Sequence, residues 1–389
     1  MKKSISKYIR QIRGVSYKPS DLHKILDENS IVLLRANNIK DGQINFDDVV
    51  YVDRKRVSPD QILQKGDVLI CASSGSVNLV GKAAQYLDGI ECTFGAFCKV
   101  ARPKEDMNKY IGLFFQSPFY RRKISQIANG ANINNIKNEH IDSFEISILS
   151  KEDEIKFISK MESMINILRK KQIQIDLLEN LVKSRFVELF GTLDNPVQEF
   201  KKATLKELCA KITDGKHGGC TQEVGTERYF VGAREIYDNV VHYDTAPEIN
   251  LAEFEKDYKR CNVEIGDFLI VNTGATIGKS AIATDPRTEC TLLQKSVALL
   301  KVKRELLNPV FLQYCYKVNE KMYKVESASA QPNLLLSKIN STEIYVPSIE
   351  LQNQFAAFVK QTDKSKFAIQ KSIDELQTLY DSLMQEYFG

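Results

Sequence analysis

The sequence lacks any apolar run of the about 18 residues that a membrane-spanning helix requires. Its first residues, 1–14, are basic, but no apolar segment follows them, so they do not resemble a signal peptide. The eight cysteines include no Cys-x-x-Cys pair, which argues against a zinc site and against a disulfide framework. We therefore expect a cytoplasmic protein whose cysteines are reduced and mostly buried.

Recognisable catalytic patterns are also missing. The four histidines have no HExxH or other metal-ligand spacing, no GxSxG string occurs, and no pair of carboxylates stands out. With 54 basic and 50 acidic residues the net charge is only +4, so charge by itself does not indicate a nucleic-acid partner. We expect a binding protein with no catalytic residue and no metal site of its own.

One string comes close to a phosphate-binding loop. Residues 273–280 (TGATIGKS) follow a predicted strand, but three residues separate the two glycines where a P-loop has four. The corresponding glycines of the first half, Gly75 and Gly81, have five residues between them. A loop of variable length does not hold one phosphate geometry, so a nucleotide-binding enzyme is a disfavoured alternative. A short polar turn with one lysine is better suited to contact with DNA.

The most informative feature that is present is an internal repeat, which sets the architecture of the chain. Residues 184–191 (SRFVELFG) match residues 382–389 (SLMQEYFG), and the matched strings run nearly end to end through both halves. The further matched pairs are 141–146 with 339–344, 65–70 with 265–270, 80–82 with 277–279, and Cys92-Thr93 with Cys290-Thr291. Segments between them, such as 40–62 and 237–262, barely resemble each other. This pattern favours two modules that do the same job on different targets, although simple drift of a duplicated sequence is an alternative.

Each copy ends in a predicted long helix with coiled-coil spacing. Residues 151–190 contain neither Gly nor Pro, and apolar residues recur at spacings of three and four. A helix of 40 residues is about 60 Å long. We expect the helices to begin near Ser150 and Ser348, the first to end at Gly191, and the two to pack antiparallel with pseudo-twofold symmetry. The alternative is that each helix folds back onto its own globular part. The predicted seam consists of Ile175, Leu178, Val182, Ile373, Leu376 and Tyr380.

The predicted fold class is α+β, in two repeated globular domains joined by the two long helices. Short β-rich runs come first in each copy, and helices follow near 107–128 and 306–326. The chain is long enough for two or three domains with proper cores. The expected boundaries are 1–150 and 197–348 for the globular domains, and 151–191 and 349–389 for the helices.

Several short strings in this order resemble one known family. They are Ile12–Tyr17, Leu34–Ile39, Leu205–Cys209, Ile212–His217, the Gly-Asp-x-Leu-Ile strands, Gln331-Pro332-Asn333-Leu334 and Val346-Pro347. With the repeat and the helices, they resemble the specificity (S) subunits of type I restriction-modification systems over the whole chain. The first half departs from this pattern, with Asn134-Asn135-Ile136 and Ile148-Leu149 at the last two positions.

The resemblance implies a function and a set of partners. Each globular part would be a target recognition domain that reads one half of a bipartite double-stranded DNA target. The paired helices would set the unspecified spacer and dock two modification (methyltransferase) subunits, which carry S-adenosylmethionine. Restriction (motor and nuclease) subunits would add ATP- and Mg-dependent translocation and cleavage. The chain itself would bind no cofactor and would not be catalytic. A scaffold that joins two proteins without touching DNA is the alternative.

Candidate DNA contacts are polar loop residues that can reach base edges or phosphates. The alternative role for each is to stabilise a turn. They are Arg35, Asn37, Asn38, Ser74, Ser76, Asn78 and Lys82 in the first copy, and Lys216, His217, Arg234, Asn272, Thr273, Thr276 and Lys279 in the second.

Overall fold

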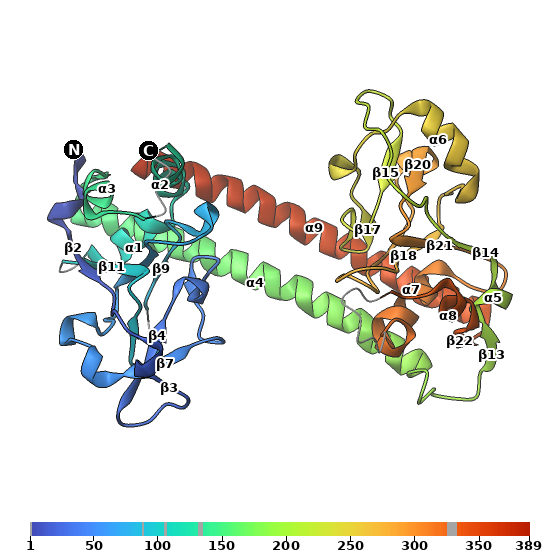
Figure 1. Ribbon diagram of the computed structural model, residues 1–389, viewed down its shortest axis with the longest axis horizontal. Helices are drawn as coiled ribbons and strands as arrows, with labels where there is room; N and C mark the ends of the chain where they lie inside the picture. The colour runs from blue at the N-terminus through green and yellow to red at the C-terminus, as the bar shows by residue number, and fades with distance from the viewer. Residues whose placement is uncertain (1, 88, 105–106, 131–134, 325–332) are drawn as a thin grey trace. The chain divides into compact units, whose positions relative to one another are not determined.

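The computed structural model describes residues 2–87, 89–104, 107–130, 135–324 and 333–389, which form two compact units (Figure 1). Unit 1 comprises Met1–Gln172 and Lys371–Gly389, and unit 2 comprises Ile173–Gln370. Each unit therefore contains one part of each long helix. The division into four domains that the sequence predicts, with each long helix as a separate domain, stays a prediction.

The two long helices begin and end where the sequence predicts. They are α4 (Lys151–Phe190) and α9 (Ile349–Phe388). The hydroxyl of Ser150 accepts a hydrogen bond from the amide of Asp153 at 3.1 Å, and that of Ser348 accepts one from Leu351 at 3.3 Å, as at capped helix starts. Gly191 follows α4 with a φ of +74°, the left-handed conformation that ends many helices.

Unit 1 is built on two four-stranded sheets. The first is antiparallel, in the order β2 (Ile9–Arg13), β11 (Cys98–Pro103), β8 (Val68–Cys71), β9 (Ala83–Gln85). The second has the order β10 (Cys92–Phe94), β4 (Ser30–Leu34), β7 (Val50–Asp53), β3 (Leu22–His23), with β10 and β4 parallel. The remaining elements are the pair β1 (Lys2–Ser4) and β12 (Glu145–Ser147), the hairpin β5 (Ile39–Lys40) and β6 (Gln43–Ile44), and helices α1 (Asn108–Gln116), α2 (Pro118–Gly130) and α3 (Asn138–Asp142). The helix predicted over 107–128 is thus two helices, broken at Ser117 before a proline.

Unit 2 repeats this framework, but its second sheet has two strands where that of unit 1 has four. Its main sheet has the order β14 (Cys209–Asp214), β21 (Val297–Val302), β18 (Phe268–Val271), β19 (Ser280–Ile282). The pair β15 (Tyr229–Val231) and β20 (Thr291–Leu293) is parallel, like β4 and β10. The remaining elements are β13 (Lys201–Thr204) with β22 (Glu343–Val346), β16 (Ile236–Tyr237) with β17 (Val240–Val241), and helices α5 (Leu205–Leu208), α6 (Leu251–Asp257), α7 (Pro309–Val318) and α8 (Leu336–Ser341). Helix α6 lies in the divergent segment, where unit 1 has strand β7.

The strand register corrects one detail of the sequence repeat. Strand β10 starts at Cys92, which lies opposite Val32, whereas β20 starts at Thr291, which lies opposite Tyr229. Cys92 therefore corresponds to Thr291, and the match of Cys92-Thr93 with Cys290-Thr291 is wrong by one residue. The dipeptide Cys-Thr occurs in both halves and suggested an alignment that the strand pairing does not support.

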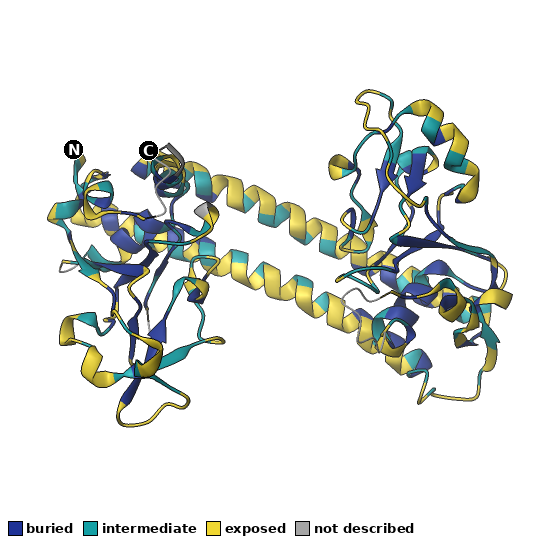
Figure 2. Cartoon of the chain, in the orientation of Figure 1, coloured by how far each residue is buried: buried dark blue, intermediate teal, exposed yellow. Residues whose placement is uncertain are grey.

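Each unit has an aromatic core completed by both long helices. In unit 1, Phe157 of α4 and Phe388 of α9 lie with ring centroids 5.7 Å apart, and both rings are buried. In unit 2, Phe186 of α4 lies 5.3 Å from Phe355 of α9. Figure 2 shows buried residues concentrated in the sheets and at both ends of these helices. Within unit 2 the helical segments run antiparallel, because Glu179 of α4 faces Lys366 of α9 at 3.9 Å, whereas the later Phe186 faces the earlier Phe355.

The predicted seam residues differ in burial. Val182 and Tyr380 are buried and belong to the cores of unit 2 and unit 1 respectively. The other four, Ile175, Leu178, Ile373 and Leu376, are half-buried. The continuous coiled-coil seam stays a prediction.

A buried ion pair recurs at the same place in both units. Asp67, which precedes β8, accepts two hydrogen bonds from Arg102 at 2.8 and 2.7 Å. Asp267, which precedes β18, pairs with Lys301 at 2.8 Å. Both aspartates also accept a main-chain amide hydrogen bond at 2.8 Å. The shared Gly-Asp of the repeat therefore ties the start of one central strand to its neighbour.

The eight cysteines are free thiols in the structure, and six of them are buried. The burial of most of them agrees with the expectation. Among the described residues, no helix is long and apolar enough to cross a membrane.

Candidate nucleic-acid interface

Four turns meet at one surface of unit 1. They follow β2, follow β4, connect β8 to β9, and connect β10 to β11. Together they surround a hollow of about 300 Å³. Its lining includes Tyr17, Arg35, Asn37, Ser74, Gly75 and Phe97. Three predicted DNA contacts from two distant segments, Arg35, Asn37 and Ser74, are therefore brought together.

Unit 2 forms a second hollow at the matching place. Its volume is about 450 Å³. The described residues that line it are Lys216, Gly218, Thr273, Gln294, Lys295, Ser296 and Asn333. Of the predicted contacts, Lys216 and Thr273 lie in this lining.

A glycine allows the turns to approach each other closely in both units. A Cβ atom on Gly14 would lie 2.1 Å from the carbonyl oxygen of Gly95, and one on Gly215 would lie 2.1 Å from that of Leu293. The amide of the next residue forms a hydrogen bond across this contact in each unit. Val15 donates to the carbonyl of Phe94, and Lys216 donates to that of Leu293, both at 2.7 Å. The same kind of close main-chain contact thus occurs in both units, although the β8–β9 and β18–β19 turns differ in length.

The turn after β4 is held by a buried side chain. The carboxamide oxygen of Asn38 accepts the amide of Arg35 at 2.8 Å, and its nitrogen donates to the carbonyls of Asn45 and Asp48, both at 2.9 Å. In unit 2, Glu235 accepts the amide of Gly232 in the same way at 2.8 Å. Asn38 is only 1% exposed, so its side chain stabilises the turn and does not face a ligand.

We expect Asn38→Ala to destabilise unit 1 by about 1–3 kcal/mol, because it leaves buried main-chain groups without partners. Thermal unfolding measures this loss. The control is Asn37→Ala at the neighbouring exposed position, which should leave stability nearly unchanged. Equal stabilities of the two variants would contradict the role of Asn38.

The repeat places Asn37 and Arg234 at equivalent positions, each directly before the buried turn residue. Both are exposed. The carboxamide of Asn37 donates to Asp48 at 2.6 Å, and Arg35 contacts the same carboxylate at 3.2 Å. Among the described residues, Arg234 has no ion-pair partner. Two predicted contacts thus occupy one structural position with different chemistry.

The lysines of the site differ in how far they are already paired. Lys216 contacts Asp257 at 2.8 Å and Glu253 at 3.3 Å, and the hydrogen bond with Asp257 is the main cause that raises its pKa. Hydrogen bonds from Thr221 are the main cause that lowers the pKa of Glu253 to about 2. Within the part of the chain that the structure describes, Lys82, Lys279 and Lys295 make no ion pair. These lysines are therefore better placed than Lys216 to meet a phosphate.

The P-loop alternative does not fit the observed topology. Strands β18 and β19, which flank the TGATIGKS string, pair antiparallel as a hairpin, whereas a P-loop connects a strand to a helix. The amide of Gly278 donates to the carbonyl of Val271 at 3.0 Å, and that of Lys279 donates to Thr276 at 3.1 Å. These amides stabilise the hairpin, so they are not free to surround a phosphate.

The other predicted contacts are distributed around the same turns. Ser76 and Asn78 are exposed in the β8–β9 turn, and Thr276 is half-buried in the β18–β19 turn. Asn272 is buried at the end of β18. His217 is exposed, with its Nε2 atom 3.5 Å from Asp214.

Sequence reasoning missed the turn between β10 and β11 in unit 1 and between β20 and β21 in unit 2. Gly95-Ala96-Phe97 of unit 1 corresponds to Gln294-Lys295-Ser296 of unit 2, and all three residues differ. Both turns line the hollows. A difference at every position between matched strands was the available signal. Tyr17 and Asn333 were missed as lining residues too.

Two strings of the family resemblance fall partly outside the described residues, namely at Asn134 and at Gln331-Pro332. The residues that follow them are equivalent in the two units. Ile136 donates its amide to the carbonyl of Ala72 at 2.7 Å, as Leu334 does to Asn272 at 2.7 Å. The departure of the first half from the pattern therefore leaves this main-chain contact intact.

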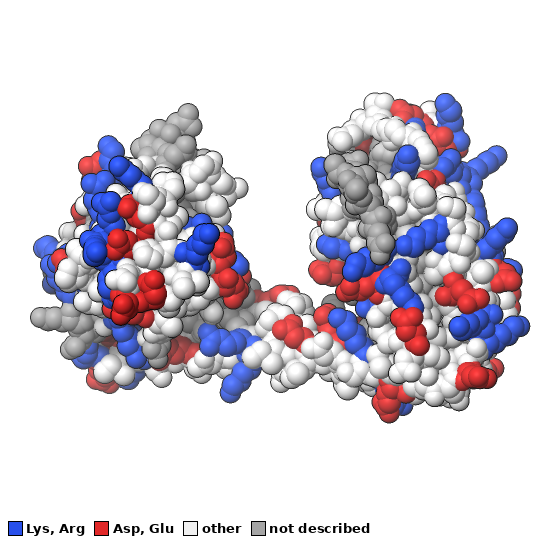
Figure 3. Space-filling model, turned by 60° about the horizontal axis from the view of Figure 1, so that its bottom comes forward, with Lys and Arg blue, Asp and Glu red and all other residues white. Residues whose placement is uncertain are grey.

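The surface charge is mixed. On the face drawn in Figure 3, Lys and Arg side chains are interspersed with Asp and Glu over both units. Non-specific attraction to DNA grows with the number of phosphates that a protein neutralises. Such a surface favours recognition by particular contacts over strong binding through charge.

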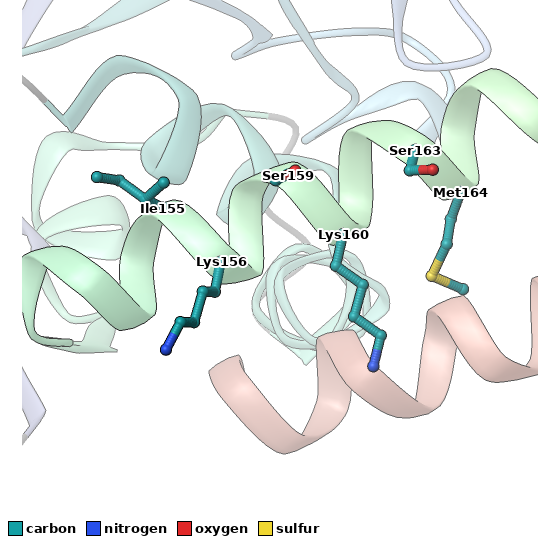
Figure 4. A pocket seen from close by; sticks show the side chains of 6 residues that line it. All are labelled: Ile155, Lys156, Ser159, Lys160, Ser163 and Met164. Atoms are coloured by element: carbon teal, nitrogen blue, oxygen red, sulfur yellow. The ribbon is translucent and has the colours of Figure 1, made fainter.

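A different hollow, of about 510 Å³, lies on helix α4 of unit 1 (Figure 4). The described residues that line it are Ile155, Lys156, Ser159, Lys160, Ser163 and Met164. None of them is a predicted DNA contact. This helix surface is therefore distinct from the turns described above.

Comparisons with known proteins agree with the fold. Residues 198–378 match the family described as "Type I restriction modification DNA specificity domain". The type I restriction enzyme StySPI specificity subunit of Salmonella potsdam is 26% identical over 392 residues, covering 96% of this chain and 84% of that protein. The EcoKI specificity subunit of Escherichia coli K12 is 25% identical over 394 residues, with the same coverage.

Two solved structures share the fold at 15% sequence identity. One comes from work on complex assembly and conformational transition of the type I R-M system; it has a TM-score of 0.59 and covers 100% of this chain and 97% of the other. The second is the S subunit of the type I restriction-modification system from M. genitalium, with a TM-score of 0.54 and coverage of 100% and 96%.

Proposed function

We infer that this chain, which belongs to the specificity subunits of type I restriction-modification systems, provides the DNA sequence specificity of such a complex. Each unit reads one half of a bipartite target in double-stranded DNA. The observation that carries this proposal is the pair of hollows at matching places, where shared main-chain contacts bring together turns that differ in their side chains. Such an arrangement is suited to two readers of the same kind with different targets.

The reading surfaces are the turns that line each hollow. Base edges in the major groove differ in their donors, acceptors and methyl groups, and polar side chains on rigid turns can distinguish them. Unpaired cations at the rim, such as Lys82 and Lys279, would contact phosphates and fix the position of the protein. The buried Asn38 and Asn272 would support the turns without contacting DNA.

The two long helices would set the unspecified spacer between the half-sites. We propose that α4 and α9 pack antiparallel along a common seam, with residues 1–150 and 197–348 as the reading domains. A rigid connection fixes half-site separation in the way that dimer geometry does in other DNA readers. The exposed surface of α4 in Figure 4 is a candidate for docking a modification subunit.

The chain has no catalytic role of its own in this proposal. Two modification subunits would supply S-adenosylmethionine-dependent adenine methylation, and restriction subunits would supply ATP- and Mg-dependent translocation and cleavage. The complex would act in the cytoplasm. The scaffold alternative predicts assembly with the same subunits but no dependence on DNA sequence.

Methylation mapping tests the proposal. The chain is co-expressed with a modification subunit, and methylated adenines are located across a bacterial genome by single-molecule sequencing. We expect a split motif with a fixed gap, of which exchange of residues 1–150 changes one half. A contiguous motif, or none from an assembled and active methyltransferase, would overturn the bipartite model and favour the scaffold.

A further inference from the structure

The most exposed aromatic side chain at the hollow of unit 1 is Phe97, in the turn between β10 and β11. It is 71% exposed, although its main chain is firmly held. Its carbonyl oxygen accepts the amides of Ala72 and Ser73, both at 2.9 Å, and the adjacent Cys98 closes the turn onto Gly95 at 2.8 Å. The ring is therefore presented to solvent from a rigid support.

The fold does not require a phenylalanine at this position. The matching residue of unit 2 is Ser296, whose carbonyl oxygen accepts the amide of Asn272 at 3.0 Å. Its hydroxyl accepts the amide of Ala233 at 3.2 Å. The same turn thus closes with a small polar residue. An apolar ring held in water here is better explained by a ligand than by packing.

The surroundings of Phe97 indicate what that ligand presents. Arg35, Asn37 and Ser74 line the same hollow, so a polar group with an apolar part would fit it. In the major groove, the only apolar group on a base edge is the 5-methyl of thymine, and adenine is the base that a carboxamide can pair in two places. An A·T pair offers both features.

Unit 2 presents the opposite chemistry at equivalent positions. There Ser296 replaces Phe97, Lys295 replaces Ala96 and Arg234 replaces Asn37. Arginine and lysine suit the two acceptors of guanine. At these three positions unit 1 is therefore the more apolar reader and unit 2 the more cationic one.

We propose that Phe97 is a specificity-determining residue that contacts the 5-methyl group of a thymine in the half-site read by unit 1. This inference rests on the proposed function and deepens it. Binding of the methyl group against the ring removes it from water, which is worth about a fourfold change in affinity.

The test uses the complex assembled with its modification subunits and duplexes carrying its mapped target. Each thymine is replaced in turn by uracil, which removes only the methyl group. For the unchanged chain, we expect one position in one half-site where uracil weakens binding about fourfold. Phe97→Ser should bind the thymine duplex as the unchanged chain binds uracil, and show no further loss with uracil. Phe97→Leu should retain most of the discrimination.

Ile25→Ala is the matched control, because Ile25 is an equally exposed apolar residue of unit 1 that does not line the hollow. It should leave the thymine preference unchanged. If Phe97→Ser weakens thymine and uracil duplexes alike while keeping the uracil effect, or if no thymine responds, the proposal is wrong. Absence of a bipartite motif for the unchanged complex would instead count against the proposed function itself.

Discussion

Replacing Phe388 by alanine should destabilise unit 1 by about 3–5 kcal/mol, although this residue stands next to the end of the chain. Its ring is fully buried and packs against Tyr110, Phe114 and Phe157 with centroid separations of 5.0, 5.5 and 5.7 Å. Removal of this ring leaves a cavity that the three surrounding rings cannot fill. Hydrogen exchange followed by mass spectrometry measures the effect, as faster exchange of the amides of β2 and β11.

Two variants control this experiment. Phe190 is the repeat equivalent of Phe388 and is buried against Phe186, Phe311 and Phe355 of unit 2. Phe190→Ala should therefore speed exchange in β14 and β21. Phe367 is 74% exposed, so Phe367→Ala should have little effect on either unit. Unchanged exchange of unit 1 in Phe388→Ala would contradict a core completed by the end of α9.

The second large effect is expected at the buried ion pair of unit 1. Asp67 is 1% exposed and holds Arg102 through two short hydrogen bonds. Asp67→Ala leaves a guanidinium group uncompensated in a buried site, which costs about 3–5 kcal/mol. Thermal or denaturant unfolding should show this loss of stability. Faster hydrogen exchange of the amides of β8 and β11 should locate it in unit 1.

An exposed pair of similar geometry provides the comparison. Arg10 and Asp60 also form two hydrogen bonds, at 3.1 and 2.8 Å, but both side chains are more than half exposed. Water screens this pair, so Asp60→Ala should barely alter stability. If Asp60→Ala and Asp67→Ala behaved alike, burial of the Asp67 pair would not be the cause of its effect.

Local sequence identity predicted the framework well. The Gly-Asp string before β8 and β18 recurs because its buried carboxylate holds the same strands in both units. The second glycine of each turn, Gly81 or Gly278, recurs because the backbone there has a positive φ. Heptad spacing and the absence of Gly and Pro correctly predicted both helices. These features depend on nearby residues, so a repeat in the sequence preserves them.

Tertiary features were harder to predict. Which turns meet at a hollow depends on strand order, and Phe97 lies far in sequence from Arg35 and Ser74. The sequence did not show that Asn38 would be buried, because an asparagine can either stabilise a turn or contact a base edge. The divergent segment gave no sign that unit 2 would form α6 where unit 1 forms β7, since neither stretch has a partner to align with.

The aromatic core of unit 1 has a consequence for how the protein is made. Residues 371–389 belong to this unit, and they leave the ribosome after all the residues of unit 2. At typical synthesis rates, about 200 further residues take roughly 10–40 s to be added after residue 172. During that time the first unit has its sheets but lacks Tyr380, Met384 and Phe388. Unit 2 is one continuous segment and can complete its core first. We therefore expect unit 2 to finish folding before unit 1, although the synthesis of unit 1 begins earlier.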